Sequence, residues 1–293
     1  MKKLLYIILF SAFIYSSCEN PFDAQLQDAE RQMVVDAWLT NEDKTQVISL
    51  TWSQHYLQNT FAEIIDDASV TVTADNGSSF VFDHTGNGKY EWTPDVNNSL
   101  GNIGDSYTLD IVRDNKSYSA VSQMNDVPVI DSIMQEFRDD EVFAEDGIYC
   151  QFFARDLEGI GDTYWIKTFR NDTFLNKATE FNIAYDAAFD SGAEVDGIIF
   201  ITPIREFANP YDNGGIPTPW TVGDIIRVEI HSITHASFDY LEILRDQLLN
   251  SLNGIFAEPL ANPIGNIQSD DNDDVVLGMF NVAGVSSITD VIN

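Results

Sequence analysis

The chain has 293 residues, 44% of them hydrophobic and 12% aromatic, with 47 Asp+Glu against 15 Lys+Arg and a formal charge of −32. This length suits one large or two modest domains, and the aromatic content excludes a disordered acidic tail. The charge argues against nucleic-acid binding, which needs a cationic surface, and against electrostatic docking onto anionic lipid. Two cysteines, Cys18 and Cys150, cannot build the disulfide framework of a small secreted module.

The first 18 residues have the layout of a targeting segment. Lys2 and Lys3 precede an apolar run over residues 4–15, which ends in small residues and Cys18. The run is shorter than the ~20 residues of a membrane span, so it predicts a signal peptide over residues 1–17. We interpret Cys18 as the lipid-attachment residue of a bacterial lipoprotein, followed by a tether over residues 18–30. An ordinary secreted protein with a chance cysteine is the alternative.

Residues 31–130 read as short strands with frequent turns, the pattern of an immunoglobulin-like β-sandwich. The Asp75-Asn76-Gly77 sequence is a hairpin signal between two of them. The predicted strands cover residues 33–39, 46–52, 68–74, 79–82, 88–92, 107–112 and 117–121. The extended segment 127–130 contains Pro128 and predicts a domain boundary near residue 130.

Residues 131–293 predict a second β-rich domain that carries one helix. Its clearest strands are expected over residues 148–153, 164–169, 198–201 and 225–230. Apolar residues at three- and four-residue steps predict a helix near residues 237–252, with Gly254 as its C-cap. Four prolines over residues 203–219 predict a loop. The fold class is therefore mainly β.

No motif in the chain indicates catalysis, a metal centre or a cofactor. His231 and His235 are four residues apart, but they lie between a strand end and a helix start, which favours polar loop histidines over zinc ligands. The acidic run 270–274 fails the EF-hand pattern, because Val275 stands at its sixth position, and an adventitious calcium site or a solvated loop remain the alternatives. Asp186, Asp190, Glu194 and Asp196 leave the same two alternatives open.

Three aromatic residues are the candidate contacts for a ligand or partner. Phe207, Tyr211 and Trp220 lie in the proline-rich loop, where exposed rings could stack on a sugar or anchor a protein. The alternative is that they pack onto the sheet of the second domain. Cys150 lies in an apolar run, which predicts a small buried core residue.

Motifs along most of the chain resemble the Bacteroidetes lipoproteins of domain of unknown function family 4249. The residues that carry the resemblance are 34–40, 68–72, 76–77, 88–90, 104–109, 129–133, 223–224, 238–240, 261–267 and 277–280. The resemblance implies a lipid-anchored protein of the outer membrane or cell surface. It also implies a companion of a TonB-dependent receptor, and it brings no catalytic residues.

We therefore expect a non-enzymatic accessory that captures a ligand or docks onto such a receptor in nutrient uptake. The lipid on Cys18 would confine it to the receptor's membrane and raise its effective concentration there. With Lys2 and Lys3 removed, 13 basic and 47 acidic residues remain, a charge of −34 that suits a basic patch on a partner. The alternatives are a surface hydrolase acting on polysaccharide or peptide, and an envelope scaffold or adhesion protein.

Overall fold

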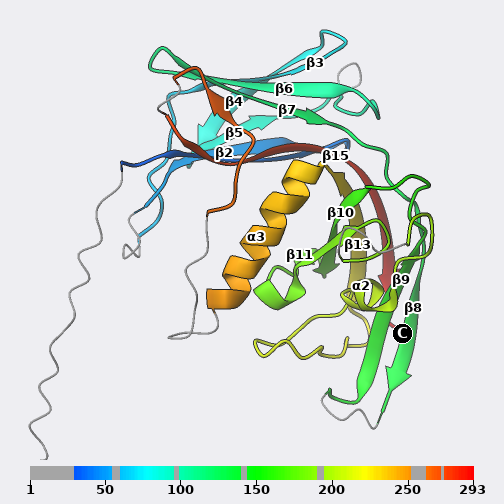
Figure 1. Ribbon diagram of the computed structural model, residues 1–293. Helices are drawn as coiled ribbons and strands as arrows, with labels where there is room; N and C mark the ends of the chain where they lie inside the picture. The colour runs from blue at the N-terminus through cyan, green and yellow to red at the C-terminus, as the bar shows by residue number, and fades with distance from the viewer. Residues whose placement is uncertain are drawn as a thin grey trace, which may run out of the picture. The chain divides into compact units, whose positions relative to one another are not determined.

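A computed structural model describes residues 30–54, 60–95, 99–139, 144–189, 195–251, 262–271 and 274–293. The predicted signal peptide, most of the tether and Cys18 lie outside these residues. The described part is mainly β, as predicted (Figure 1).

The first seven strands follow the pattern expected from the sequence. They are β1 (Met33–Thr40), β2 (Gln46–Trp52), β3 (Ser69–Ala74), β4 (Ser79–Gly86), β5 (Lys89–Trp92), β6 (Ser106–Arg113) and β7 (Lys116–Gln123). Their side chains alternate between buried and accessible because successive residues of a strand point to opposite faces. The predicted hairpin forms between β3 and β4, where Gly77 has a φ of 89°.

These strands enclose the first hydrophobic core. They hydrogen-bond in the order β1-β2-β5-β4-β3-β6-β7, and β4 pairs with β3 through its first half and with β5 through its second. The two layers that meet at β4 bury Leu39 and Ile48 against Val72 and Leu109. This arrangement is a two-layer β-sandwich.

The remaining elements are more varied than the sequence suggests. The strands are β8 (Ile130–Arg138), β9 (Gly147–Ala154), β10 (Thr163–Arg170), β11 (Thr173–Phe174), β12 (Asn182–Tyr185), β13 (Ile225–Ile233), β14 (Gln268–Ser269) and β15 (Val276–Val291), and the helices are η1 (Ala178–Glu180), α2 (Thr202–Glu206) and α3 (His235–Ser251). The predicted strand over residues 198–201 is wrong, since only an isolated bridge joins Ile199 to Arg155. Residues 202–206 form a helix rather than a loop because Pro203 suits a first helical turn.

The helix predicted near residues 237–252 is present as α3. Phe238 and Leu241 are buried, and Leu244 packs against the same cluster. Thr234 precedes the helix, and its hydroxyl accepts a hydrogen bond from the Ser237 N–H at 3.3 Å. This contact is a side-chain cap at the helix start. Leu252 and Gly254 lie outside the described residues.

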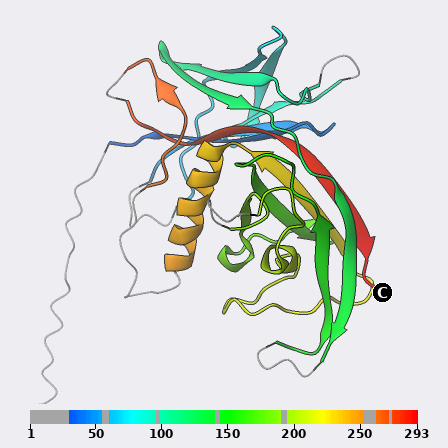
Figure 2. The ribbon, with the colours of Figure 1, turned by 45° about the vertical axis from the view of Figure 1, so that its right-hand side comes forward.

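The last strand connects the two halves of the fold. Residues 276–283 of β15 pair parallel with β1, and residues 284–291 pair antiparallel with β13 (Figure 2). Phe280 and Val282 belong to the first core, whereas Ile288 packs against a second core formed around β9, β10 and β13. Residues 31–293 form one compact unit, so the domain boundary near residue 130 stays a prediction.

Candidate functional site

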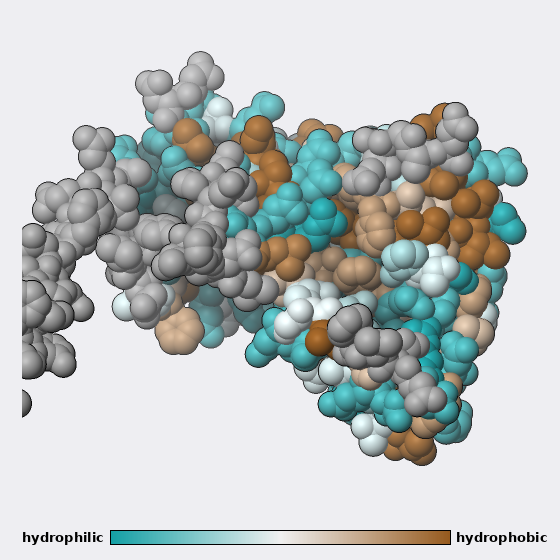
Figure 3. All heavy atoms as spheres, turned by 60° about the horizontal axis from the view of Figure 1, so that its bottom comes forward, coloured by the Kyte–Doolittle hydropathy of each residue, from teal (hydrophilic) through white to brown (hydrophobic). Residues whose placement is uncertain are grey.

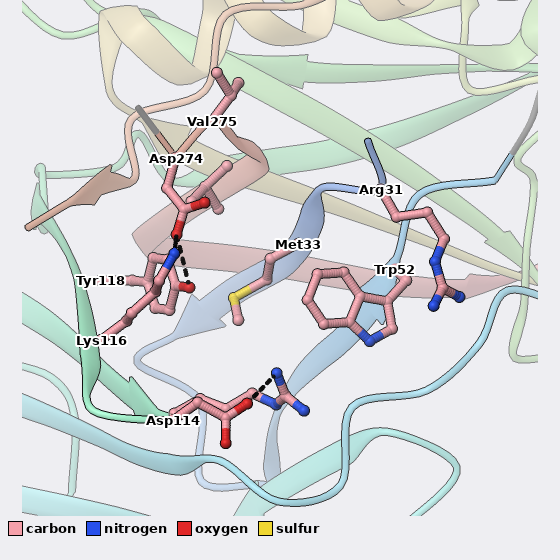
Figure 4. Close-up of a pocket in the computed structure, with 10 residues that line it drawn as sticks. Arg31, Met33, Trp52, Asp114, Lys116, Tyr118, Asp274 and Val275 are labelled. Carbon is pink, nitrogen blue, oxygen red and sulfur yellow. Dashed lines mark hydrogen bonds and ion pairs between the residues drawn. The ribbon is translucent and has the colours of Figure 1, made fainter. Parts of the chain in front are cut away.

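A pocket lies where the start of β1 meets β2, the β6–β7 turn and the beginning of β15 (Figure 4). Its volume is about 250 Å³. The residues that line it are Arg31, Met33, Trp52, Arg113, Asp114, Lys116, Tyr118, Asp274, Val275 and Val276. We call it the Trp52 pocket. Three cationic residues thus line one pocket, and two of them, Arg31 and Arg113, lie over its indole ring.

Acidic side chains pair with all three cations. Arg31 pairs with Glu63, and the Arg113 guanidinium binds both Asp67 oxygens at 2.6 and 3.0 Å. The hydrogen bonds to Asp67 raise the pKa of Arg113. The two guanidinium carbons lie 5.8 and 5.3 Å from the centroid of the Trp52 ring, within the range of cation–π attraction.

Lys116 connects the Trp52 pocket to the acidic run that the sequence singled out. Its ammonium contacts Asp274 at 2.5 Å, and the Asp270 carboxylate accepts a hydrogen bond from the Ser117 N–H. These carboxylates therefore fasten the segment before β15 to β7. Asn272 and Asp273 of the same run lie outside the described residues.

A second cavity of about 560 Å³ adjoins the first and shares Asp274, Val275 and Val276 with it. Residues 262–265 and 267–269 also line it. Ile264 is 81% exposed and Val275 is 57% exposed, so apolar side chains face solvent at its rim. We call it the Ile264 groove.

A different cluster occupies the face of the β10-β13-β15-β1 sheet that α3 partly covers. The strand register places Trp165 opposite His231, and Lys167 opposite Glu229. Because β1 pairs with β15, Asp36 and Trp38 lie on the same face. We use the name Lys167 cluster for Asp36, Trp38, Trp165, Lys167, Glu229 and His231, together with Tyr240 of α3.

Glu229 is the buried anion of this cluster. It pairs with Arg227, and its Oε2 lies 2.9 Å from His231 Nε2. Burial, reinforced by the nearby Lys167 charge, lowers the pKa of His231 well below its usual value. His231 is thus a neutral, buried strand residue, and its interpretation as a polar loop histidine is wrong. His235 begins α3, with its ring 5.4 Å from that of Tyr185.

Lys167 is the cation of the cluster without a carboxylate partner. Its Nζ lies 3.8 Å from the Trp165 ring centroid, and within the described chain it makes no hydrogen bond or ion pair. Burial, and next the charge of Lys44, lower the pKa of this ammonium to about 7. Asp36 and Glu42 oppose that shift.

A second group of carboxylates lies near the β9–β10 connection. The buried Asp186 accepts hydrogen bonds from the N–H groups of Gly161 and Asp162 at 2.7 and 2.9 Å. Burial, followed by the charges of Asp156 and Asp186, raises the pKa of Asp162 to about 6. Asp196 accepts a hydrogen bond from the Gly159 N–H, whereas the predicted candidates Asp190 and Glu194 lie outside the described residues. Among the described side chains, no set of three or more His, Cys, Asp or Glu residues has the arrangement of a metal site.

The three aromatic candidates do not share one environment. Trp220 is 4% exposed, belongs to the second core and donates a hydrogen bond to Asn209 Oδ1 at 3.2 Å. Phe207 and Tyr211 are half-buried, with ring centroids 5.4 Å apart. Their role as partner contacts stays a prediction. Cys150 is buried in the second core, as predicted, and Cys18, the predicted lipid-attachment residue, lies outside the described residues.

Sequence reasoning missed both the Trp52 pocket and the Lys167 cluster. A signal for the second was present, because the predicted strand over residues 164–169 places Trp165, Lys167 and Phe169 on one face. A lysine between two aromatic residues is unusual on a strand face that is expected to pack against another layer, because charged side chains are rarely buried. It indicates that this face contains other polar groups.

Together these features define a mainly β protein in which one strand joins a sandwich to a second sheet, with two aromatic and ion-paired sites at its surfaces. The model of the family described as Domain of unknown function (DUF4249) matches residues 19–289. The chain therefore belongs to this family. No curated protein matches it. None of the described helices has the length and apolar character needed to cross a membrane.

Proposed function

We propose that the protein is a Bacteroidetes lipoprotein, anchored in the outer membrane through Cys18, that assists a TonB-dependent receptor in nutrient uptake. The observation that carries the proposal is the order of Lys2 and Lys3, the apolar run and Cys18 at the start of the chain. It is the arrangement of a lipoprotein signal, and multiple acyl chains hold a protein on a membrane at about 0.8 kcal/mol per buried CH₂.

The described surfaces support a binding role. In the Trp52 pocket the cations are already paired, so the groups offered to a partner are an aromatic ring and apolar side chains. The adjoining Ile264 groove adds exposed aliphatic residues. Hydrophobic residues are also grouped among hydrophilic ones on the face seen in Figure 3. Exposed apolar patches bordered by polar residues are typical of protein-docking surfaces.

A mild-detergent pull-down of the tagged protein from its own outer membranes tests the proposal. We expect recovery of a stoichiometric TonB-dependent receptor with the wild type and with Cys150→Ala, which keeps the anchor. Cys18→Ala should lose both membrane fractionation and the receptor. Recovery of no receptor, while the protein still fractionates with the outer membrane, would refute the accessory role.

A surface hydrolase is the second candidate, favoured by the raised pKa of Asp162 beside Asp156. A carboxyl group with a pKa of about 6 can act as a general acid near neutral pH. Hydrolysis of polysaccharide or peptide by the purified protein, abolished in Asp162→Asn but not in the exposed variant Asp110→Asn, would establish this activity. Equal activity in the two variants would remove Asp162 from consideration.

A further inference from the structure

We infer that the free edge of β8 binds an extended segment of a partner protein by strand addition, and that this segment alternates apolar with basic residues. The inference concerns the isolated protein and depends neither on the lipid anchor nor on a receptor. It rests on backbone groups of β8 that the described fold leaves without a partner, and on the side chains beside them.

The hydrogen bonds of β9 show which way the backbone groups of β8 point. β8 and β9 are antiparallel, with Gln135 opposite Cys150. The Cys150 N–H donates to Asn209 Oδ1 at 2.7 Å, and the Cys150 C=O accepts from Asn209 Nδ2 at 3.0 Å. Opposite residues of an antiparallel pair exchange both hydrogen bonds or neither, in alternation. The N–H and C=O of Gln135 therefore point away from β9, and so do those of Ile133 and Phe137, two residues to either side.

This edge of β8 is open in the described part of the chain. No described backbone segment pairs with it, and in Figure 1 β8 is the outer strand of the hairpin. The large sheet ends instead in β11 and β14, which have two residues each, whereas β8 has nine. Short edge strands protect a sheet against further pairing, and a long open edge is a template for another strand.

One face of the open edge is apolar. Ile133, Gln135 and Phe137 share this face because side chains alternate along a strand. Phe137 is 66% exposed, and Ile133 is only partly buried against the second core. Val291 is 47% exposed and lies beside them, since Gln135 Nε2 donates a hydrogen bond to its carbonyl oxygen at 2.9 Å. An added strand would place every second side chain against these residues, which favours apolar residues at those positions.

The remaining charges along β8 are mostly negative. Arg138 is the one cation of the strand, and Glu136 and Glu206 share it at 3.3 and 2.8 Å. Asp131 and Asp139 are exposed near the two ends of β8, and neither forms an ion pair within the described chain. Basic residues of a partner complement these carboxylates. A second copy of this acidic chain would instead bring carboxylates against carboxylates.

Isothermal titration of the purified full-length protein in mild detergent tests the inference, with the peptide acetyl-Lys-Val-Lys-Val-Lys-Val-Lys-amide as the probe. In antiparallel addition its valines lie opposite Ile133, Gln135 and Phe137. The control peptide carries an N-methyl group on each valine, so it keeps the charge but cannot donate hydrogen bonds to β8. We expect the unmethylated peptide to bind at least about tenfold more tightly than the control. The peptide with Glu in place of Lys should also bind at least about tenfold more weakly.

Two variants isolate one backbone group of the edge. Phe137→Pro removes the outward N–H and leaves the β8–β9 hydrogen bonds intact, because residue 137 makes none of them. Phe137→Ala keeps the N–H and is the matched control for the lost ring. We expect Phe137→Pro to bind the peptide at least about fivefold more weakly than Phe137→Ala. Val81→Ala, at an exposed position of β4, should bind like the wild type.

Hydrogen exchange of the wild-type protein gives an independent readout. The amides of Ile133, Gln135 and Phe137 should exchange more slowly when the peptide is bound, which attraction between charges alone would not produce. Circular dichroism confirms that each variant is folded. If Phe137→Pro does not fold, the methylated peptide and the hydrogen exchange of the wild type decide the question.

Four results would overturn the inference. Equal affinity for the methylated and unmethylated peptides would show that charge alone attracts them. Equal affinity of Phe137→Pro and Phe137→Ala, or no slowing of exchange in β8, would exclude strand addition at this edge. A dimer in the absence of peptide that Phe137→Pro dissociates would assign the edge to a second copy of the chain.

Discussion

Replacement of Gly278 by alanine tests whether the parallel β1–β15 pairing connects the two halves of the fold. Gly278 has a φ of 100°, and its partner across the ladder is Val35. A Cβ at position 278 would lie 1.9 Å from the carbonyl oxygen of Val35. Because that oxygen belongs to the backbone of a buried strand, the clash can be relieved only by moving the strand.

The expected loss of unfolding free energy in Gly278→Ala has two contributions. A non-glycine residue in the left-handed region costs about 1–2 kcal/mol. Forcing an extra atom into a closely packed site adds about 1–3 kcal/mol. We therefore expect Gly278→Ala to lower the free energy of unfolding by about 2–5 kcal/mol. At about 2 °C per kcal/mol for a chain of this size, the melting temperature should fall by about 4–10 °C.

Gly104→Ala is the matched control. Gly104 has a φ of 93°, but nothing lies within 4 Å of the position of a Cβ there. This variant should lose only the conformational contribution, about 1–2 kcal/mol. Urea unfolding followed by tryptophan fluorescence measures both variants. If Gly278→Ala loses no more stability than Gly104→Ala, the close contact of β1 and β15 does not have the role assigned to it.

Three further predictions concern single side chains. Thr234→Ala removes the cap of α3 and should cost about 1 kcal/mol of unfolding free energy, whereas Thr289→Ala at the exposed end of β15 should cost less than half of that in the same urea titration. Asp162 has its pKa raised from 3.8 to about 6, so the folded state binds the proton more tightly and this group opposes folding increasingly as the pH rises from 4 to 6. Asp162→Asn should therefore stabilise the protein by about 1 kcal/mol at pH 7.5 and have little effect at pH 4, a difference that equal shifts at both pH values would contradict. Burial raises the pKa of the Cys150 thiol to about 12, so in the Cys18→Ala variant a maleimide should label it only after denaturation, and rapid labelling of the native protein would show that the site opens.

Local patterns were sufficient to predict most strands of the sandwich. Val70 and Val72 alternate with polar residues and are followed by a turn sequence, so both the strand and its hairpin are determined within a dozen residues. The same reasoning failed for β15. Gly278 and Gly284 interrupt its hydrophobic pattern, and both are needed because other backbone segments approach them closely. Its two partners, β1 and β13, lie far away in the sequence, and no local pattern specifies such pairing.

The two sites were missed for the same reason. The Lys167 cluster contains Asp36 of β1, Lys167 of β10 and Tyr240 of α3, which lie far apart in the sequence. The order of the strands and the packing of α3 bring these residues to one face. His231 illustrates the consequence, because its burial follows from Glu229 beside it and β10 next to it rather than from its immediate sequence. The burial of Cys150 could be predicted because the apolar run around it is local.

The position of β1 relates the two sites to each other. Met33 faces the first core and lines the Trp52 pocket, whereas Asp36 and Trp38 point to the opposite face and belong to the Lys167 cluster. The same parallel ladder with β15 holds both faces in register. The backbone of residue 265 passes close to β15, since a Cβ on residue 265 would lie 2.1 Å from the carbonyl oxygen of Gly278. The Trp52 pocket and the Lys167 cluster therefore lie on opposite faces of one strand, which the parallel ladder with β15 holds in place.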